Sequence, residues 1–407
     1  MGERRLTDPH RLNTRTLRLT ERSPAWFHVK HLPAEVGEHL WRHYSAQVAV
    51  EFPSPKTQGG WELRALGWVG TIPLPSGLML HIAPKVEISN LFRMLEYAYH
   101  LRSVRFLDDL IHCEDLPEVY EQLALILARK VLERSRKGFH RAFVSQRSDG
   151  HCVRGRIELN DLARRPWAVP PRCQIQRSTV DVEDNQILAW TLYTIAHSGL
   201  CGPRSHTVVG RAWRTLRNAV TLKPFSPADC VQRSYHRMNQ DYAPLHALCR
   251  FFLAHSGPQH ERGDHPTLPF LVHMDRLFEQ FVAAWFSTHL PEHLAIRAQQ
   301  RVDVDRRTHV YFNIDLVLYD LGTGQVLGVL DTKYKDAERP SSEDLAQLVA
   351  YAQSLSCRRA FLIYPLAFEQ PFDIHVGDVR IQRLAFPLSG DLDHNGHRML
   401  ASLLESM

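Results

Sequence analysis

The sequence lacks the long apolar runs that membrane proteins need. It contains no stretch of about 18 or more consecutive apolar residues, the length at which a transmembrane helix becomes plausible. Its N-terminus also lacks a positively charged start followed by an apolar segment, which is typical of secretory signals. We therefore expect a cytoplasmic protein with no membrane partner.

Two other patterns are missing. The seven cysteines include no Cys-x₂-Cys pair, and their odd number argues against a disulfide framework as well as a zinc ribbon. The pattern Gly-x-x-x-x-Gly-Lys-[Ser/Thr] is absent too, so the chain has no P-loop with which to bind a nucleotide. We infer that this chain is not its own NTP-driven motor.

Length and composition predict two or three folded domains, because the chain has 407 residues of which 44% are hydrophobic. Residues 1–25 are polar and show no sustained period, so we expect a loose tail. Short apolar segments broken by proline and glycine predict a small β-rich domain over residues 26–88. Its loop 53–60 either faces a partner or simply connects a hairpin. Helical spacing predicts a mainly helical region over residues 89–256.

The middle of the chain is its basic part. Residues 129–237 contain 20 Lys+Arg and 8 Asp+Glu, a net of +12, whereas the whole chain is +5 and residues 270–407 have 13 against 18, a net of −5. Such clusters suit a DNA phosphate backbone, although solvated helix faces have the same composition. The candidate DNA-binding residues are Arg134, Arg136, Lys137, Arg154 and Arg156.

Two apolar runs near the C-terminus, residues 310–319 and 326–335, predict a pair of adjacent strands. Both are rich in β-branched and aromatic residues, and the glycines of residues 321–324 between them suit an antiparallel reversal. Alternation along the strands places Asp331 on the same face as Lys333. We expect Asp315 to meet Asp331 across this hairpin.

Two carboxylates held together repel each other unless a cation or a proton lies between them. Hard oxygen ligands suit Mg²⁺ or Mn²⁺, and Lys333 would lie beside the metal, where it could orient water or stabilise a phosphate. Asp315 and Asp331 are thus candidate metal ligands, and Lys333 is a candidate catalytic residue. A lone Asp-x-Lys after a strand is also common on solvated sheet faces.

Helices flank the predicted hairpin. An apolar stripe over residues 274–286 carries Glu279 at its edge, as a third candidate ligand or as a solvated glutamate. Ser341, with an acid three residues later, predicts the start of a second helix. On it Gln347 and Tyr351 lie one turn apart, where they either support the site or pack.

These residues carry a resemblance. Asp315, Asp331, Lys333, Gln347 and Tyr351, in this order, resemble the PD-(D/E)xK nuclease superfamily in its variant with a downstream Gln-x-x-x-Tyr, although Ile314 replaces the usual proline. The chain more narrowly resembles the McrC family, the nuclease subunits of McrBC-type modification-dependent restriction systems. The supporting stretches are residues 67–70, 82–85, 90–97, 153–157, 184–188, 277–281 and 330–335.

The resemblance implies a multidomain α+β protein with a β-rich N-terminal domain, a helical basic middle and a C-terminal α/β PD-(D/E)xK core over residues 270–407. It also implies Mg²⁺-dependent cleavage of modified DNA, together with an McrB-like AAA+ GTPase that forms a hexameric ring and receives the N-terminal domain of this chain. Two alternatives stay open. One is a DNA-binding adaptor or activator of a partner NTPase with an idle nuclease core, and the other is a stand-alone repair or CRISPR-type nuclease.

Overall fold

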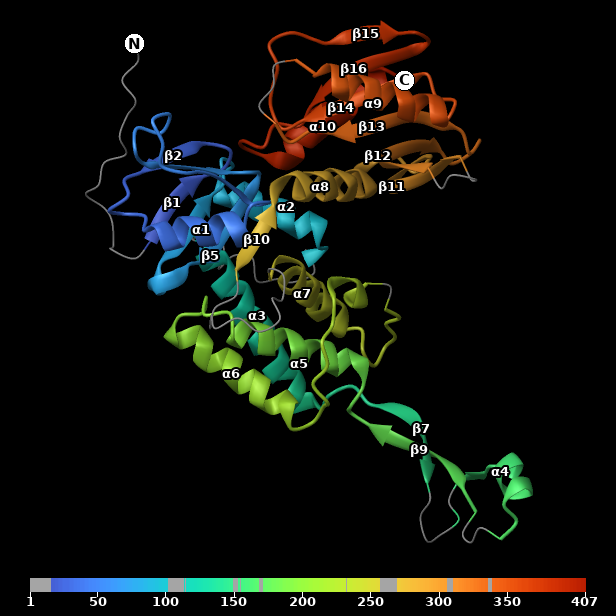
Figure 1. Ribbon diagram of the computed structural model, residues 1–407. Helices are drawn as coiled ribbons and strands as arrows, with labels where there is room; N and C mark the ends of the chain where they lie inside the picture. Colours follow the sequence, from blue (N-terminus) through green and yellow to red (C-terminus); the bar gives the residue numbers. More distant parts are fainter. Residues whose placement is uncertain are drawn as a thin grey trace. The chain divides into compact units, whose positions relative to one another are not determined.

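The computed structural model contains two compact units, Met1–Val119 with Pro269–Met407 (unit 1) and Tyr120–Leu268 (unit 2). Figure 1 shows the helices and strands of both. None of the helices in the described parts of the chain is both long and apolar enough to span a bilayer. The structure describes residues 16–101, 113, 115–148, 153, 155–167, 171–231, 233–256, 269–305, 310–335 and 339–407.

Unit 1 contains two small sheets built from the N-terminal part of the chain. The first has the order β1-β6-β5-β10 and the second β2-β4-β3, with helix α1 (Ala34–His43) beside β3. The loop 53–60 connects the antiparallel strands β3 and β4 as a hairpin. The strands are β1 (Thr16–Thr20), β2 (Pro24–Phe27), β3 (Val48–Glu51), β4 (Trp61–Ala65), β5 (Trp68–Pro73), β6 (Met79–Ala83) and β10 (Phe270–His273).

The prediction of a loose tail is wrong for residues 16–25, and residues 1–15 lie outside the described residues. β1 pairs in parallel with β6, and its Leu17 and Leu19 are buried on one face of the strand. This alternation spans only five residues between charged neighbours, so the strand has little local signal of its own. Pairing with β6 stabilises it.

The domain boundaries predicted at residues 88/89 and 270 also differ from those of the structure. β10, placed at the start of the C-terminal domain, pairs antiparallel with β5. Helix α2 (Ile88–Ala98), assigned to the helical middle, packs against α8 of the C-terminal part. The N-terminal sheets, α2 and the C-terminal region therefore form one compact unit.

The C-terminal part of unit 1 is built on a six-stranded mixed sheet with the order β11-β12-β13-β14-β16-β15. The predicted hairpin is confirmed, since β12 and β13 are antiparallel. β13 and β14 then run parallel, with the intervening helix α9 packed on both, as Figure 1 shows. The strands are β11 (Leu294–Asp305), β12 (Val310–Asp320), β13 (Val326–Thr332), β14 (Arg359–Tyr364), β15 (Asp373–Val376) and β16 (Val379–Ala385).

Three helices cover this sheet: α8 (Met274–His289), α9 (Ser342–Ser354) and α10 (Leu392–Glu405). The apolar stripe predicted for α8 is confirmed, because its large apolar side chains are buried. α9 begins at the predicted cap, where the Ser341 side chain accepts from the Asp344 backbone N–H and Asp344 bonds back to Ser341. Local sequence thus sets where α9 begins.

Unit 2 is mainly helical, with the helices α3 (Leu116–Lys137), α4 (Leu159–Arg164), α5 (Glu183–Ala196), α6 (Pro203–Arg217) and α7 (Tyr242–His255). A buried polar network joins α5 and α7. Asn185 donates to the carbonyls of His140 and Val180 and accepts from the Tyr242 hydroxyl. The stretch 184–188 therefore has a structural role in this unit.

A small sheet, β7-β9-β8, extends as an arm from the helices of unit 2 (Figure 1). Its strands are β7 (Ala142–Ser148), β8 (Arg156–Ile157) and β9 (Cys173–Thr179). These three strands lie within residues 89–256, the region predicted to be mainly helical. β9 is mostly polar, and its pairing with β7 along seven residues stabilises it.

Candidate active site

The register of the β12–β13 hairpin brings the two predicted acids together. Leu316 pairs with Leu330 and Val317 with Val329, so continuing the register by one residue sets Asp315 opposite Asp331. The Asp315 carboxylate accepts hydrogen bonds from the backbone N–H and the hydroxyl of Thr332, both at 3.1 Å. The residue after Asp331 therefore fixes Asp315 in place.

Lys333 follows the end of β13 and lies against Asp331. Its Nζ is 2.7 Å from Asp331 Oδ2, and the two side chains are 19% and 2% exposed. Its backbone N–H donates to the Ile363 carbonyl of β14 at 2.8 Å, so the chain stays attached to the sheet beyond the last residue of the strand. The site thus has a buried acid and a cation that still reaches solvent.

The electrostatics of Asp331 are unusual for an aspartate. Burial and the neighbouring Asp315 carboxylate raise the pKa of Asp331 to about 7, although the Lys333 ammonium acts in the opposite direction. Burial acts to lower the pKa of Lys333, but the carboxylates of Asp331, Asp344 and Asp315 outweigh it and leave this pKa raised. One lysine therefore does not neutralise the acids around it.

Glu279 on α8 belongs to the same electrostatic cluster. Burial and the Asp315 carboxylate raise the pKa of Glu279 to about 7. The Gln299 side chain of β11 donates a hydrogen bond to Glu279. The structure thus brings Glu279 within electrostatic reach of Asp315, but Glu279, Asp315 and Asp331 do not form a group of three that could hold a metal ion.

α9 links its predicted residues to Lys333. Gln347 accepts a hydrogen bond from Lys333 Nζ at 3.3 Å through Oε1 and donates to the Tyr351 hydroxyl at 2.6 Å through Nε2. Tyr351 is 7% exposed and packs in the core under the sheet. Tyr351 therefore packs in the core and also bonds to Gln347, so packing does not exclude the predicted support of the site.

Asp344 is a site residue that the sequence analysis treated only as part of a cap. Its carboxylate is 2.5 Å from Lys335 Nζ and 3.8 Å from Lys333 Nζ. Burial acts to raise the pKa of Asp344, but hydrogen bonds from Lys335 and Ser341 outweigh it and leave the pKa below its usual range. The signal in the sequence is an acid in the first turn of the helix that follows Asp-x-Lys-x-Lys (residues 331–335).

The donor chemistry of this cluster fits a hard divalent cation. Burial and the Asp315 carboxylate raise the pKa values of Asp331 and Glu279, and a bound cation would favour the ionised form of both acids. No group of three or more His, Cys, Asp or Glu within the described ranges is arranged to hold a metal alone. Mg²⁺ commonly uses one or two carboxylates with water and substrate phosphate, so Asp315 and Asp331 suffice as protein ligands.

The candidate DNA-binding residues fall into two groups. Arg134 is 3.2 Å from Asp241, donates to the Met238 carbonyl and lies over the Tyr242 ring, so its guanidinium is used inside unit 2. Arg136, Lys137 and Arg156 are exposed, whereas Arg154 lies outside the described residues. The prediction of a phosphate contact for Arg134 is not favoured by these internal contacts, because binding DNA would break them.

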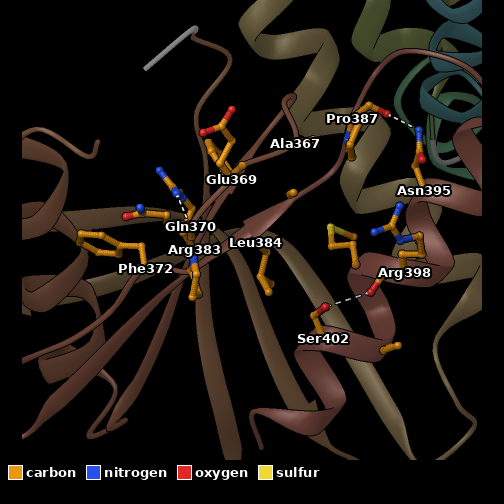
Figure 2. A pocket seen from close by; sticks show the side chains of 15 residues that line it. Ala367, Glu369, Gln370, Phe372, Arg383, Leu384, Pro387, Asn395, Arg398 and Ser402 are labelled. Carbon is orange, nitrogen blue, oxygen red and sulfur yellow. Dashed lines mark hydrogen bonds between the residues drawn. The ribbon is translucent and has the colours of Figure 1, made fainter. Parts of the chain in front are cut away.

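A pocket of 530 Å³ near the C-terminus is separate from this site (Figure 2). Several of its polar groups are bonded within the chain: Arg383 donates to the Gln370 carbonyl, Asn395 to the Pro387 carbonyl and Ser402 to the Arg398 carbonyl. Arg383 also stacks on Phe368, at 3.4 Å from the ring centroid. The Asn395 bond joins α10 to the segment after β16, and the other contacts lie within α10 or between β16 and residues 368–370, so these polar groups have a structural role.

The fold of this chain is similar to that of a chain in a solved assembly of McrB with bound McrC. Over 95% of this chain and 100% of the other, it is similar at a TM-score of 0.56 and 16% identity to a structure described as "Refined half-complex from tetradecameric assembly of Thermococcus gammatolerans McrB AAA+ hexamers with bound McrC". A second structure, of the Thermococcus gammatolerans McrBC complex, matches with a TM-score of 0.43 and 16% identity over 70% of this chain and 89% of the other.

The model of the family "McrBC 5-methylcytosine restriction system component" matches residues 63–365. The chain belongs to this family. No individual curated protein sequence matches it. The resemblance to McrC that the sequence motifs carry is confirmed by the family match together with the fold.

Proposed function

We propose that this chain is the metal-dependent DNA endonuclease subunit of an McrBC-like, modification-dependent restriction system, with a PD-(D/E)xK core over residues 270–407. The observation that carries the proposal is the 2.7 Å pair of Lys333 and Asp331 beside Asp315, in a cluster whose acids exceed its cations. Two acids and a lysine where two strands meet are the groups that metal-assisted phosphodiester hydrolysis uses.

A Mg²⁺ or Mn²⁺ ion, when bound, would supply a water of lowered pKa and offset negative charge on the scissile phosphate. Asp315 and Asp331 are the proposed ligands, and Glu279 is a nearby acid that would add negative charge around the ion. Lys333 directs its ammonium at the attacking water or the phosphate. Gln347 accepts from this ammonium, and Tyr351 in turn holds Gln347, so both limit where the lysine points.

The proposed partners follow from the family and from the similar structure. That structure contains McrB AAA+ hexamers with bound McrC, and we propose an McrB-like GTPase ring as the partner of this chain, which has no P-loop of its own. Methylated duplex DNA, met in the cytoplasm, is the proposed substrate. The exposed Arg136, Lys137 and Arg156 are its proposed phosphate contacts on unit 2.

The test is cleavage of methylated and unmethylated linear DNA by the chain together with its McrB-like partner, with GTP and Mg²⁺. The wild type should cut methylated DNA, and Asp331→Ala should abolish cutting at every Mg²⁺ concentration while partner binding is retained. Asp373→Ala is a matched control, because Asp373 pairs with Arg380 at 2.6 Å on the opposite edge strand of the same sheet. Undiminished cutting by Asp331→Ala would exclude the assignment.

A second measurement needs no partner. Mn²⁺ should raise the melting temperature of the wild type more than that of Asp331→Ala or Asp315→Ala, since a ligand that binds only the folded state stabilises it. Equal shifts in all three proteins would support the alternative of an idle core. Cutting by the purified chain without any ring would support the stand-alone nuclease.

A further inference from the structure

The segment that follows β1 contacts the residues that directly follow β13, among them the neighbour of Lys333. Glu21 is fully buried, and its Oε2 accepts hydrogen bonds from the Tyr334 hydroxyl at 3.1 Å and from the Lys85 backbone N–H at 3.4 Å. Tyr334 is 8% exposed and comes directly after Lys333. A residue of the N-terminal sheets is therefore hydrogen-bonded to the neighbour of the proposed catalytic lysine.

The same segment also contacts α8, which carries Glu279. Arg22 Nη2 is 2.5 Å from Asp275 Oδ1 in the first turn of α8, and the Gly67 carbonyl accepts from the Met274 backbone N–H at 2.9 Å. Gly67 has φ +77°, and a Cβ there would lie 2.8 Å from Asp275 Oδ2. Only glycine fits here without disturbing the Arg22–Asp275 pair.

Ring contacts at Tyr334 add to its hydrogen bond with Glu21. The Tyr334 ring lies 5.8 Å from that of Phe278 on α8, and the Arg22 guanidinium lies over it at 5.6 Å. A pocket of 250 Å³ opens beside Glu21, Tyr334 and Lys335, so dense packing does not hold this part of the chain on all sides. The directional hydrogen bond from Tyr334 to Glu21 then helps to fix the course of the backbone after Lys333.

We propose that Glu21 and Tyr334 are positioning residues that hold Lys333 in line with Asp331 and couple the N-terminal sheets to the active site. This inference rests on the proposed nuclease function. A lysine side chain is long and flexible, so the backbone that follows it must be fixed if Nζ is to stay at a reacting phosphate. A partner that binds the N-terminal sheets and moves β1 would thereby change cleavage without touching the acids.

The test is a double-mutant cycle with the full chain and its partner ring, in single-turnover cleavage at saturating DNA and Mg²⁺. Tyr334→Phe keeps the ring and removes the hydroxyl, and it should slow cleavage about tenfold, because small misplacements of catalytic groups are costly. In the Lys333→Ala background the same change should cost less than about twofold, since the effect acts through the lysine. Equal losses in both backgrounds would overturn the inference.

Further variants separate positioning from folding. Glu21→Gln can still accept from Tyr334 and should stay within about twofold of the wild type, whereas Glu21→Leu should resemble Tyr334→Phe. Tyr319→Phe is the matched control, because it removes a 2.8 Å hydrogen bond to Gln300 in the same sheet and should leave cleavage unchanged. A similar loss in Tyr319→Phe would overturn the inference in favour of a general loss of stability.

The Mn²⁺-induced rise in melting temperature gives a readout besides activity. It should be the same in Tyr334→Phe and in the wild type, because the proposed metal ligands are not touched. Loss of this rise would mean that Tyr334 supports the metal site and would overturn the assignment to Lys333. Only this inference fails if Tyr334→Phe cleaves DNA as fast as the wild type while Asp331→Ala does not cleave it. If the wild type itself does not cleave DNA, the proposed function fails together with this inference.

Discussion

Asp184 in unit 2 and Asp331 in unit 1 are both buried aspartates, but their surroundings differ. Asp184 accepts two hydrogen bonds from Arg233, at 2.9 and 2.7 Å, and a third from Asn239 at 3.2 Å. Burial acts to raise its pKa, but these donors outweigh burial and leave the pKa lowered. Asp331 has one ammonium and neighbouring carboxylates, and its pKa is raised to about 7.

On the proposed function, this difference in pKa separates an acid that stabilises the fold from an acid that binds metal. A buried carboxylate that serves the fold is given enough donors to stay ionised in the folded state, as Asp184 is. Asp331 lacks such donors, so in the metal-free protein it is a source of strain that a cation would remove. Perturbed electrostatics of this kind are common at functional sites.

The largest expected effect comes from neutralising each aspartate in turn. Asp184→Asn removes the charge that pairs with Arg233 at 2.7 Å and leaves this half-buried cation only the 3.4 Å pair with the exposed Glu183, so it should cost about 3–5 kcal/mol of unfolding free energy. Asp331→Asn relieves repulsion with Asp315, and Lys333 keeps Gln347 and Asp344, so metal-free stability should be unchanged or higher. Urea-induced unfolding in EDTA measures both. An equally large loss of unfolding free energy in Asp331→Asn would show that Asp331 and Lys333 form a structural ion pair, and the two aspartates would then not differ in role.

The cations beside these acids offer the next test. Lys333→Ala should slow cleavage by about 10²–10³ while metal binding is retained, since one such electrostatic donor is typically worth this much. Lys335→Ala is the matched control, because Lys335 pairs with Asp344 and should cost less than about tenfold. Single-turnover cleavage rates of the two variants measure this difference. A loss of less than tenfold for Lys333→Ala would show that this lysine, like Arg233, is structural.

The pH dependence should differ in sign between the two regions. The folded-state pKa values of Asp331 and Glu279 are raised from 3.8 and 4.5 to about 7, so the folded protein keeps protons that the unfolded chain has lost. Metal-free stability should therefore fall as pH rises between about 4 and about 7 through these groups, whereas Asp184, with a lowered pKa, loses its contribution only as pH falls below about 4. Unfolding free energies of the wild type and Asp331→Asn, compared across this range, measure the effect. A difference that does not change with pH would contradict the prediction.

The smallest expected effect concerns basic residues of unit 2, some of which bond within the fold while others are exposed and could contact DNA. Reversing the exposed Arg136 and Lys137 should weaken binding to every DNA sequence alike and lower the salt slope by about 0.9 for each phosphate that is no longer neutralised. Arg134→Glu should instead reduce the stability of unit 2, because it breaks the interactions with Asp241 and Tyr242. Binding measured at several salt concentrations distinguishes the two. An unchanged salt slope for the exposed pair would mean that they are only a solvated helix end.

The sequence by itself determined the elements with strong local patterns. The hairpin of β12 and β13, the apolar stripe of α8 and the Ser341 cap of α9 are all visible as spacing, because the period of a strand or helix and the chemistry of a cap act over a few residues. The hairpin register then places Asp315 opposite Asp331. For this reason Asp315, Asp331 and Gln347 could be predicted near Lys333 from the chain alone, whereas Asp344 was predicted only as part of a helix cap.

Only the tertiary structure decided which distant segments meet. β1 is a strand because β6 pairs with it, β10 joins the N-terminal sheet through β5, and Glu21 reaches Tyr334 across more than 300 residues of sequence. The raised pKa of Asp331 likewise depends on burial and on neighbours from other elements. Such long-range pairings depend on the whole set of packed elements, so no local period in the sequence encodes them.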